Sequence, residues 1–188
     1  MRIILASESE YRKHALNVLG LKYEVIPSDL DERNITEADS AMLAKKMSEA
    51  KAIKIGDKNP DSLIIAADLF VVFNSKILHK PKDETEAIEM LSSLSGKKFE
   101  IMTGLAVYNS HSKTILSTVE VCKVTFRKLT QYEIKDYVSR YPVLKCAAAF
   151  ESDGLLRFAK SINGSYNFRA ALPVDKLVLF LREQGMKV

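Results

Sequence analysis

The segment LIIAADLFVVF, residues 63 to 73, constrains the fold more than any other part of the sequence. Its eleven residues carry a single charge, that of Asp68. A run this rich in Val, Ile and Phe predicts a strand covered on both faces, where an unpaired carboxylate is costly. Two explanations stay open: a buried salt bridge or a strand that ends near Asp68, and a metal ion or a reacting water.

The other segments place this strand in an α/β protein with a mixed sheet. Apolar runs at 2–6 and 23–28 predict two further strands, and periodic apolar residues predict helices at 36–55 and 84–96. Two long β segments at 99–109 and 114–129 are separated by the polar turn SHSK, which indicates a hairpin. The tetrapeptide TQYE, at 130–133, is typical of a capping box at the start of a helix.

Length and composition predict one soluble, cytoplasmic domain over residues 1–188. A hydrophobic content of 47% supports a substantial core, two cysteines are too few for a disulfide scaffold, and no apolar run is long enough for a membrane span. The net charge of +4 is spread along the chain, with no block of like charge longer than a pair. This distribution favours an anionic small molecule and predicts neither a nucleic-acid nor a membrane partner.

Residues 6–13, ASESEYRK, lie where a strand gives way to a helix. Backbone N–H groups at a helix N-terminus, with Ser7 and Arg12 close by, form a natural anion site. The alternative is that Ser9 is an ordinary N-cap and Arg12 a solvated surface residue. Both interpretations remain open at this stage.

Two lysines and an acidic loop complete the candidates. Lys51 interrupts the apolar stripe of the helix at 36–55, either for function or by snorkelling to solvent at the edge of the stripe. Lys80 precedes Pro81, which favours an extended backbone. The acidic segment DLDER at 29–33 could form a hard-cation site together with Asp68, although such a loop is usually just solvated.

Taken in order, several short motifs resemble the Maf family of nucleoside-triphosphate pyrophosphatases. The motifs that carry the resemblance are LASES with Arg12, DE at 31–32, EAKA at 49–52, AAD at 66–68, HKP at 79–81, LSSLSG at 91–96, MTGLAV at 102–107 and CAAAFESDGL at 146–155. The resemblance implies a fold similar to that of inosine-triphosphate pyrophosphatases: an elongated mixed sheet with flanking helices, a cleft between two lobes, and a homodimer.

The same resemblance implies an activity and a set of site residues. A nucleoside triphosphate would be hydrolysed between its α- and β-phosphates with a divalent cation, Mg²⁺ or Mn²⁺. The residues implied to contact phosphates are Ser7, Arg12, Lys51 and Lys80. Glu32 and Asp68 are implied to hold the metal and the water, and we expect Asp68 to accept the proton.

Tyr11, Leu69 and Asp153 occupy positions where Maf subgroups differ, and they resemble most closely the subgroup that acts on 7-methyl-GTP. Stacking of a cationic methylated guanine on Tyr11 and acceptance of its N–H groups by Asp153 would favour this base. Asp153 could also be only a turn residue. The alternatives are a dTTP/UTP pyrophosphatase, or a weakly active or inactive nucleotide-binding regulator of cell division.

Some residues depart from the family pattern. Glu10 stands where proline is usual and adds a carboxylate near the expected phosphate site, and Leu69 stands where a polar residue is usual. Ala147 and Ala171 stand where glycine is usual. Reduced activity is the expected consequence if these residues disturb the site.

Overall fold

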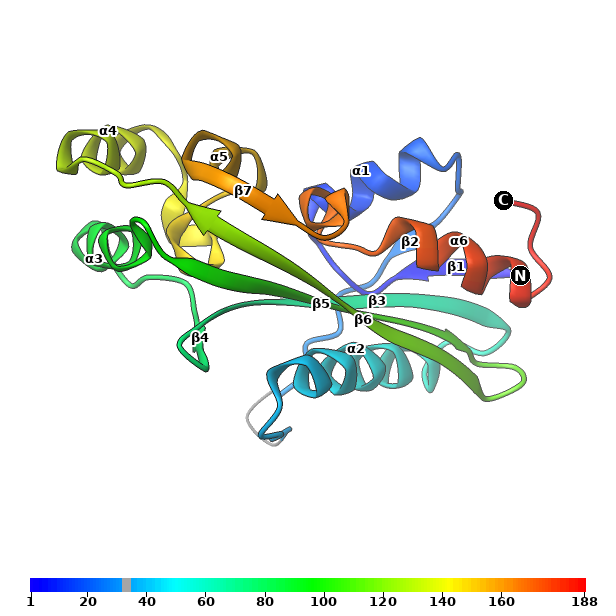
Figure 1. Cartoon of the computed structure of the whole chain (residues 1–188). Helices are drawn as coiled ribbons and strands as arrows, with labels where there is room; N and C mark the ends of the chain where they lie inside the picture. Colours follow the sequence, from blue (N-terminus) through cyan, green and yellow to red (C-terminus); the bar gives the residue numbers. More distant parts are fainter. Residues whose placement is uncertain (32–34) are drawn as a thin grey trace. The chain divides into compact units, whose positions relative to one another are not determined.

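The structure, a computed structural model, describes residues 1–31 and 35–188. These residues form two compact units (Figure 1). Unit 1 comprises residues 1–69, 103–120 and 166–188, and unit 2 comprises residues 70–102 and 121–165. The expectation of a single domain over residues 1–188 stays a prediction.

In unit 1 the sheet is covered on both faces. Strand β1 (Arg2–Leu5) pairs in parallel with β2 (Glu24–Val25) and with β3 (Ser62–Phe73). Helices α1 (Glu10–Val18) and α6 (Val174–Glu183) pack on one face, and α2 (Ser40–Gly56) packs on the other (Figure 1).

The two-sided cover explains the continuous apolar run in β3. Successive residues of a strand point to opposite faces, so Leu63 and Ile65 join the cluster under α1 and α6, while Ile64 and Ala66 join the cluster under α2. The expected strand at 62–73 is confirmed. Every residue from 62 to 67 is buried, residues 68–70 are partly exposed, and Val71 and Val72 are buried again.

Unit 2 is built around an aromatic core. It contains β4 (Lys76–Leu78), α3 (Glu84–Leu94), α4 (Gln131–Arg140), α5 (Ser152–Phe158) and β7 (Ala159–Asn163). Two short 3-10 helices, η2 (Val143–Lys145) and η3 (Ala147–Ala149), follow α4, and a third, η4 (Tyr166–Ala170), belongs to unit 1. The rings of the core contact one another edge to face or tilted; they are Phe99, Phe126, Tyr137, Phe150 and Phe158.

The strand order β2-β1-β3-β5-β6-β7 confirms the expected mixed sheet with flanking helices. Strands β5 (Lys98–Asn109) and β6 (Thr114–Phe126) are neighbours, as the predicted hairpin requires. Strand β7 pairs with β6 in the antiparallel sense, and β4 pairs with the end of β3 in the same sense. Within the described part of the chain, no helix is long and apolar enough to cross a membrane.

Local signals predicted most helix ends correctly. The capping box at 130–133 is confirmed, because Thr130 accepts from the Glu133 backbone and the Glu133 side chain accepts from the Thr130 backbone. The predicted start of α2 at residue 36 is wrong. Helix α2 begins at Ser40, because the Asp39 carboxylate caps it by accepting a hydrogen bond from the Met42 backbone N–H.

Candidate functional site

A pocket of about 250 Å³ lies in unit 1 beyond the C-terminal end of β1. It is lined by Ala6, Ser7, Glu8, Arg12, Pro27, Ser28, Asp29, Leu30 and Lys51. The C-terminal ends of parallel strands are where α/β proteins commonly place their ligands. Three residues predicted from the sequence, Ser7, Arg12 and Lys51, therefore come together here.

Ser7 and Arg12 form a connected pair at one wall of this pocket. The Ser7 hydroxyl oxygen accepts hydrogen bonds from the Ser9 backbone N–H at 3.2 Å and from Arg12 Nη1 at 3.0 Å. Arg12 Nε donates to the Ala171 carbonyl at 2.9 Å. The guanidinium is thus held at two points, and the idea that Arg12 is a solvated surface residue is wrong.

Asp68 and Lys51 form a largely buried ion pair. Lys51 Nζ lies 2.8 Å from Asp68 Oδ1, and the two side chains are only 12% and 14% exposed. Snorkelling of Lys51 to solvent is therefore wrong. Among the described residues, no group donates a hydrogen bond to the second carboxylate oxygen, Asp68 Oδ2, although this oxygen is buried.

The salt bridge thus explains only part of the charge in β3. A salt bridge accounts for one oxygen of Asp68, and burial lessens at this residue although β3 continues to Phe73. The salt bridge leaves the other oxygen without a donor among the described residues. A buried, unsatisfied carboxylate oxygen is destabilising unless a water, an ion or a ligand group meets it.

Close packing of α2 on β5 fixes the position of Lys51. A Cβ atom on Gly104 would lie 2.1 Å from the Ala44 carbonyl oxygen, so only glycine lets the helix backbone approach the strand this closely. The Lys54 ammonium, one turn beyond Lys51, donates to the Asp29 carbonyl of the pocket wall. Asp29 itself has a positive φ of 41°. These contacts connect α2 directly to the loop that lines the pocket.

The electrostatics of the pocket are mixed in sign. Burial lowers the pKa of the Arg12 guanidinium, and the nearby Asp68 carboxylate opposes this change. Arg12 and Lys51 supply positive charge to the pocket, while Glu8 and Asp29 lie on its wall with negative charge. Sequence reasoning missed Glu8 and Ser28 and treated Asp29 only as part of an acidic loop; their one sequence signal is their place at or just after the end of a predicted strand.

Glu10 does not disturb the pocket through an unpaired charge. Its carboxylate is 84% exposed and lies 2.8 Å from Lys13 Nζ. Ser9 occupies the N-cap position of α1, but its side chain makes no capping hydrogen bond. Glu10 therefore repels a bound phosphate less than an unpaired carboxylate would, because the Lys13 ammonium balances its charge.

Unit 2 contains two further residues predicted from the sequence. Lys80 is exposed in the loop between β4 and α3, where the His79 carbonyl accepts a hydrogen bond from the Ala148 N–H at 3.1 Å. Burial raises the pKa of the nearby Cys146 thiol to about 11, and Lys80 acts in the opposite direction. The loop of Lys80 is thus fixed against η3.

Asp153 is an exposed acid in the first turn of α5, which also suits a purely structural role at a helix N-terminus. The next residue must be glycine, because a Cβ on Gly154 would lie 1.8 Å from the Tyr137 hydroxyl oxygen. That hydroxyl also accepts from the Glu151 N–H at 3.0 Å. The motif around Asp153 therefore has a packing function whatever Asp153 binds.

Three other predicted residues have simpler placements. Tyr11 is 37% exposed on α1, and Leu69 is partly exposed next to Asp68 in β3. Glu32 lies outside the described residues. The proposed roles of all these residues stay predictions.

The backbone that favours glycine lies one and two residues after Ala147. The residues with left-handed backbones are Ala148 at φ 56° and Ala149 at φ 62°, whereas Ala147 is not among the described residues with positive φ. Ala171 does have a left-handed backbone, with φ 49°. Glycine would adopt these conformations with less strain than alanine.

The described residues suit a weakly held divalent cation better than a closed metal site. They contain no group of three or more His, Cys, Asp or Glu side chains placed to bind a metal. Mg²⁺ at phosphate-transfer sites needs only one or two carboxylates, with phosphates and waters as its other ligands. The unsatisfied Asp68 Oδ2 fits such a requirement.

Solved structures with the same fold define its class. A HAM1 protein from Coxiella burnetii has a TM-score of 0.52 at 16% identity, over 97% of this chain and 99% of that protein. The Ham1 protein of Staphylococcus aureus has the same TM-score at 14% identity, over 98% of this chain and all of that protein. The chain thus has the HAM1 fold.

Sequence comparison identifies the family within this fold. A family model described as Maf-like protein matches residues 2–184. A protein of Aquifex aeolicus named dTTP/UTP pyrophosphatase is 35% identical over 99% of this chain and 97% of its own length, and one of Desulforamulus reducens with the same name is 38% identical over 99% and 98%. The chain belongs to the Maf-like family.

Proposed function

We propose that this protein hydrolyses a nucleoside triphosphate between the α- and β-phosphates, releasing the nucleoside monophosphate and pyrophosphate. The observation that carries the proposal is the unsatisfied, buried Asp68 Oδ2 beside Lys51, in a chain whose pocket also presents Ser7 and Arg12. The name pyrophosphatase borne by the relatives supports it.

The residues of unit 1 fit the chemistry of this reaction. Lys51 holds one carboxylate oxygen of Asp68 and leaves the other to accept a proton. A water beside Oδ2 would give its proton to this oxygen while its own oxygen bonds to phosphorus and the bridging P–O bond breaks. Attack is at the α-phosphorus, so the electron pair of that bond leaves with the departing pyrophosphate.

Arg12 and Ser7 would bind the phosphate charge that develops during this step. Two of the Arg12 nitrogens are already fixed, by Ala171 and Ser7, so the guanidinium is oriented before substrate arrives. The Ser7 oxygen accepts two hydrogen bonds, which leaves its O–H free to donate to a phosphate oxygen. We propose that Lys80 contributes a further positive charge.

We also propose that Asp68 and Glu32 hold a divalent cation, Mg²⁺ or Mn²⁺. When bound, such a cation activates water and neutralises phosphate charge. The homodimer and the cytoplasmic location remain proposals as well. The hypothesis of an inactive regulator rested on Glu10 and Leu69. Because Glu10 is paired with Lys13, only Leu69 still supports it.

For the base of the substrate, the comparisons favour dTTP and UTP over 7-methyl-GTP. The relatives are named for dTTP and UTP, and 7-methyl-GTP has no such support. We therefore propose dTTP and UTP as substrates. The exposed, first-turn position of Asp153 suits a structural role as well as a contact with a base.

Assays of a panel of nucleotides with Mg²⁺ test both the proposed reaction and the proposed substrates. Pyrophosphate release should be fastest, as kcat/KM, with dTTP and UTP, and slower with GTP and 7-methyl-GTP. A higher kcat/KM for 7-methyl-GTP would overturn the substrate and keep the reaction. Absence of release with every nucleotide at high protein concentration would overturn the reaction itself.

A further inference from the structure

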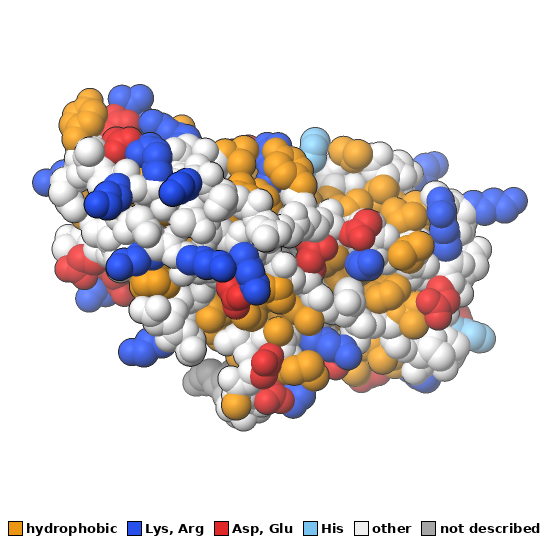
Figure 2. Space-filling model, viewed as in Figure 1, with side chains coloured by type: hydrophobic (Ala, Val, Ile, Leu, Met, Phe, Trp, Pro, Cys, Tyr) orange, Lys and Arg blue, Asp and Glu red, His pale blue; other side chains and the backbone are white. Residues whose placement is uncertain are grey.

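The net positive charge of this protein comes entirely from unit 2. This unit contains thirteen of the 28 basic residues of the chain and nine of its 24 acidic residues. Unit 1 has the remaining fifteen of each sign and is neutral. Lys and Arg side chains accordingly gather over the part of the molecule that contains α3, α4 and β7 (Figure 2).

Backbone hydrogen bonds bring five of these cations to one end of the sheet in unit 2. We call this cluster the basic rim; its members are Lys97, Lys98, Arg127, Lys128 and Lys160. The Phe126 N–H donates to the Lys97 carbonyl at 2.9 Å, and the Gly96 N–H donates to the Arg127 carbonyl at 3.0 Å. These bonds join the start of β5 to the end of β6.

The third strand of the rim is β7. The Arg127 N–H donates to the Phe158 carbonyl at 2.9 Å, and Phe126 is paired with Ala159, directly before Lys160. The pairing shifts register at this point, where Thr125 pairs with Ser161 and Lys160 is the extra residue. Because neighbouring strands lie about 4.8 Å apart, the backbone segments that carry the five cations span roughly 10 Å across three adjacent strands.

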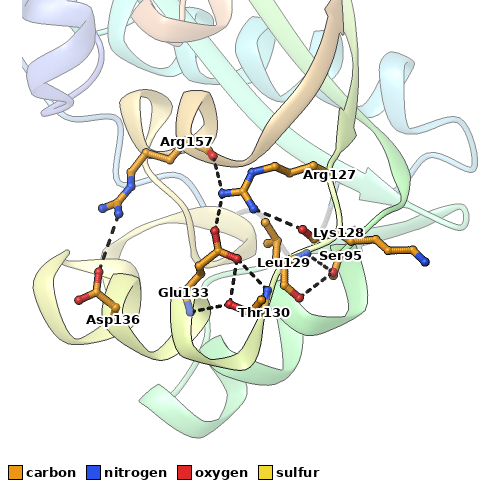
Figure 3. Close-up of polar contacts among 8 residues, drawn as sticks. All are labelled: Ser95, Arg127, Lys128, Leu129, Thr130, Glu133, Asp136 and Arg157. Carbon is orange, nitrogen blue, oxygen red and sulfur yellow. Dashed lines mark hydrogen bonds and ion pairs between the residues drawn. The ribbon is translucent and has the colours of Figure 1, made fainter.

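Few carboxylates neutralise the basic rim. Arg127 pairs with Glu133 at 2.7 Å, and the same side chain donates to the Arg157 and Lys128 carbonyls (Figure 3). The four lysines of the rim are exposed and form no ion pair among the described residues. In Figure 3 the Lys128 side chain extends away from the network, with no contact drawn at its amine.

The nature of the rim selects among anionic partners. A small anion would use only one or two of the cations, whereas a polyanion can contact several of them. Anionic membranes usually take apolar anchors besides charge, and the exposed large apolar residues of unit 2, Tyr132, Leu144 and Leu156, all lie off the strands. Stacking of single-stranded bases needs exposed aromatics, but Phe99 and Phe126 of these strands face the core.

We infer that the basic rim binds the phosphate backbone of double-stranded nucleic acid without reading its sequence. Lysines that contact phosphates give affinity through release of counterions and carry no base information. This surface lies in unit 2 and uses none of the residues proposed for nucleotide hydrolysis. The inference therefore stands or falls independently of the proposed function.

Fluorescence anisotropy with a labelled duplex of about 20 base pairs tests the inference. The full chain should bind at low salt, and four phosphate contacts predict that affinity falls about 100-fold between 50 and 200 mM salt. A rim variant with Lys97→Glu, Lys128→Glu and Lys160→Glu should bind at least tenfold more weakly than the wild type.

The matched control carries Lys22→Glu, Lys58→Glu and Lys187→Glu, three exposed lysines of unit 1, and has the same net charge. It should lose less than about threefold in affinity. Equal losses in both triple variants, or wild-type binding that is absent at low salt, would overturn the inference. Binding to phosphatidylserine vesicles without binding to the duplex would overturn it as well. Unchanged melting temperature shows that each variant is folded.

Discussion

The two units of this protein use their charges in opposite ways. In unit 1 the basic and acidic residues are equal in number, and those of the candidate site turn inward, where Lys51 meets Asp68 and Arg12 meets Ser7. In unit 2 the excess cations point to solvent from a rim of strands. Net charge thus reveals little about a buried site, because the charges of such a site are paired with one another. It reveals more about an exposed surface whose charges are not paired.

The units are alike in how each fixes a candidate phosphate-binding cation. Arg12 in unit 1 donates to the carbonyl of Ala171, and the loop of Lys80 in unit 2 is held by the N–H of Ala148. Both alanines have left-handed backbones, which cost an L-residue roughly 1–2 kcal/mol. In each unit a strained turn therefore supplies the backbone group that positions the loop or side chain.

The largest expected effect is that of Asp68→Asn on hydrolysis. The amide cannot take a proton from water and binds a hard cation poorly, so we expect at least a 100-fold loss of kcat, or about 2.7 kcal/mol in the barrier. Steady-state release of pyrophosphate measures it. Asp61→Asn, at an exposed acid paired with His111, is the control and should change nothing. A variant that keeps a tenth of the rate would contradict the role of Asp68.

Lys51→Met should lower both activity and stability. It leaves the Asp68 carboxylate largely buried without its ion partner, which we expect to reduce the free energy of unfolding by about 2–4 kcal/mol. Urea denaturation measures this loss. The double variant Lys51→Met with Asp68→Leu should regain most of the stability and none of the activity. If activity returned with stability, the pair would be structural only.

Arg12→Lys tests whether the geometry of the guanidinium matters as well as its charge. A lysine cannot donate to Ala171 and Ser7 at once, as Nε and Nη1 of Arg12 do. We expect KM for the nucleotide to rise about tenfold. Lys13→Arg, at the solvent-exposed pair with Glu10, is the matched control and should leave KM unchanged. An equal KM for Arg12→Lys and wild type would show that charge alone suffices.

In unit 2, Glu133 should give a measurable pH dependence of stability. Hydrogen bonds from Arg127 and Thr130 lower the pKa of Glu133 to about 2 from its usual 4.5. A lowered folded-state pKa stabilises the fold above pH 4.5, and this contribution is lost as pH falls toward 2. The melting temperature of Glu133→Gln should therefore fall less steeply over this window than that of the wild type. If the melting temperatures of the two proteins fell in parallel with pH, the lowered pKa of Glu133 would be contradicted.

The smallest expected effect is that of glycine at the strained turns. Ala148→Gly and Ala171→Gly should raise the free energy of unfolding by up to about 1 kcal/mol, because glycine adopts positive φ without strain. Ala147→Gly, next to Ala148, should lower it by roughly 0.5–1 kcal/mol. Chemical denaturation measures all three. If Ala147→Gly were the stabilising change, the turn would have a different backbone from that described.

Much of the fold was predictable because its signals are local. The continuous apolar run of β3 indicated a strand covered on both faces, and the Thr130 and Glu133 pair fixed the start of α4. The start of α2 was placed at Thr36, a possible cap by residue type, whereas the helix is capped by Asp39. Only the hydrogen bond to Met42 distinguishes them.

For the candidate site, residue types and order were sufficient to select Ser7, Arg12, Lys51 and Asp68. They were not sufficient to show that Lys51 occupies one oxygen of Asp68 and leaves the other, or that Ala171 holds Arg12. Glu8 and Ser28 were missed for the same reason. Each of these facts joins residues from distant segments, and no sequence spacing encodes their distance.

The sequence by itself determined the class of fold, the presence of one carboxylate that needs a partner, and the family to which the chain belongs, because periodicity, burial cost and ordered motifs are properties of the linear chain. The tertiary structure decided where charge accumulates. The five cations of the basic rim are scattered over 97–160 in the sequence and form no block there. They become neighbours only because β5, β6 and β7 pair through backbone hydrogen bonds that are indifferent to side-chain identity.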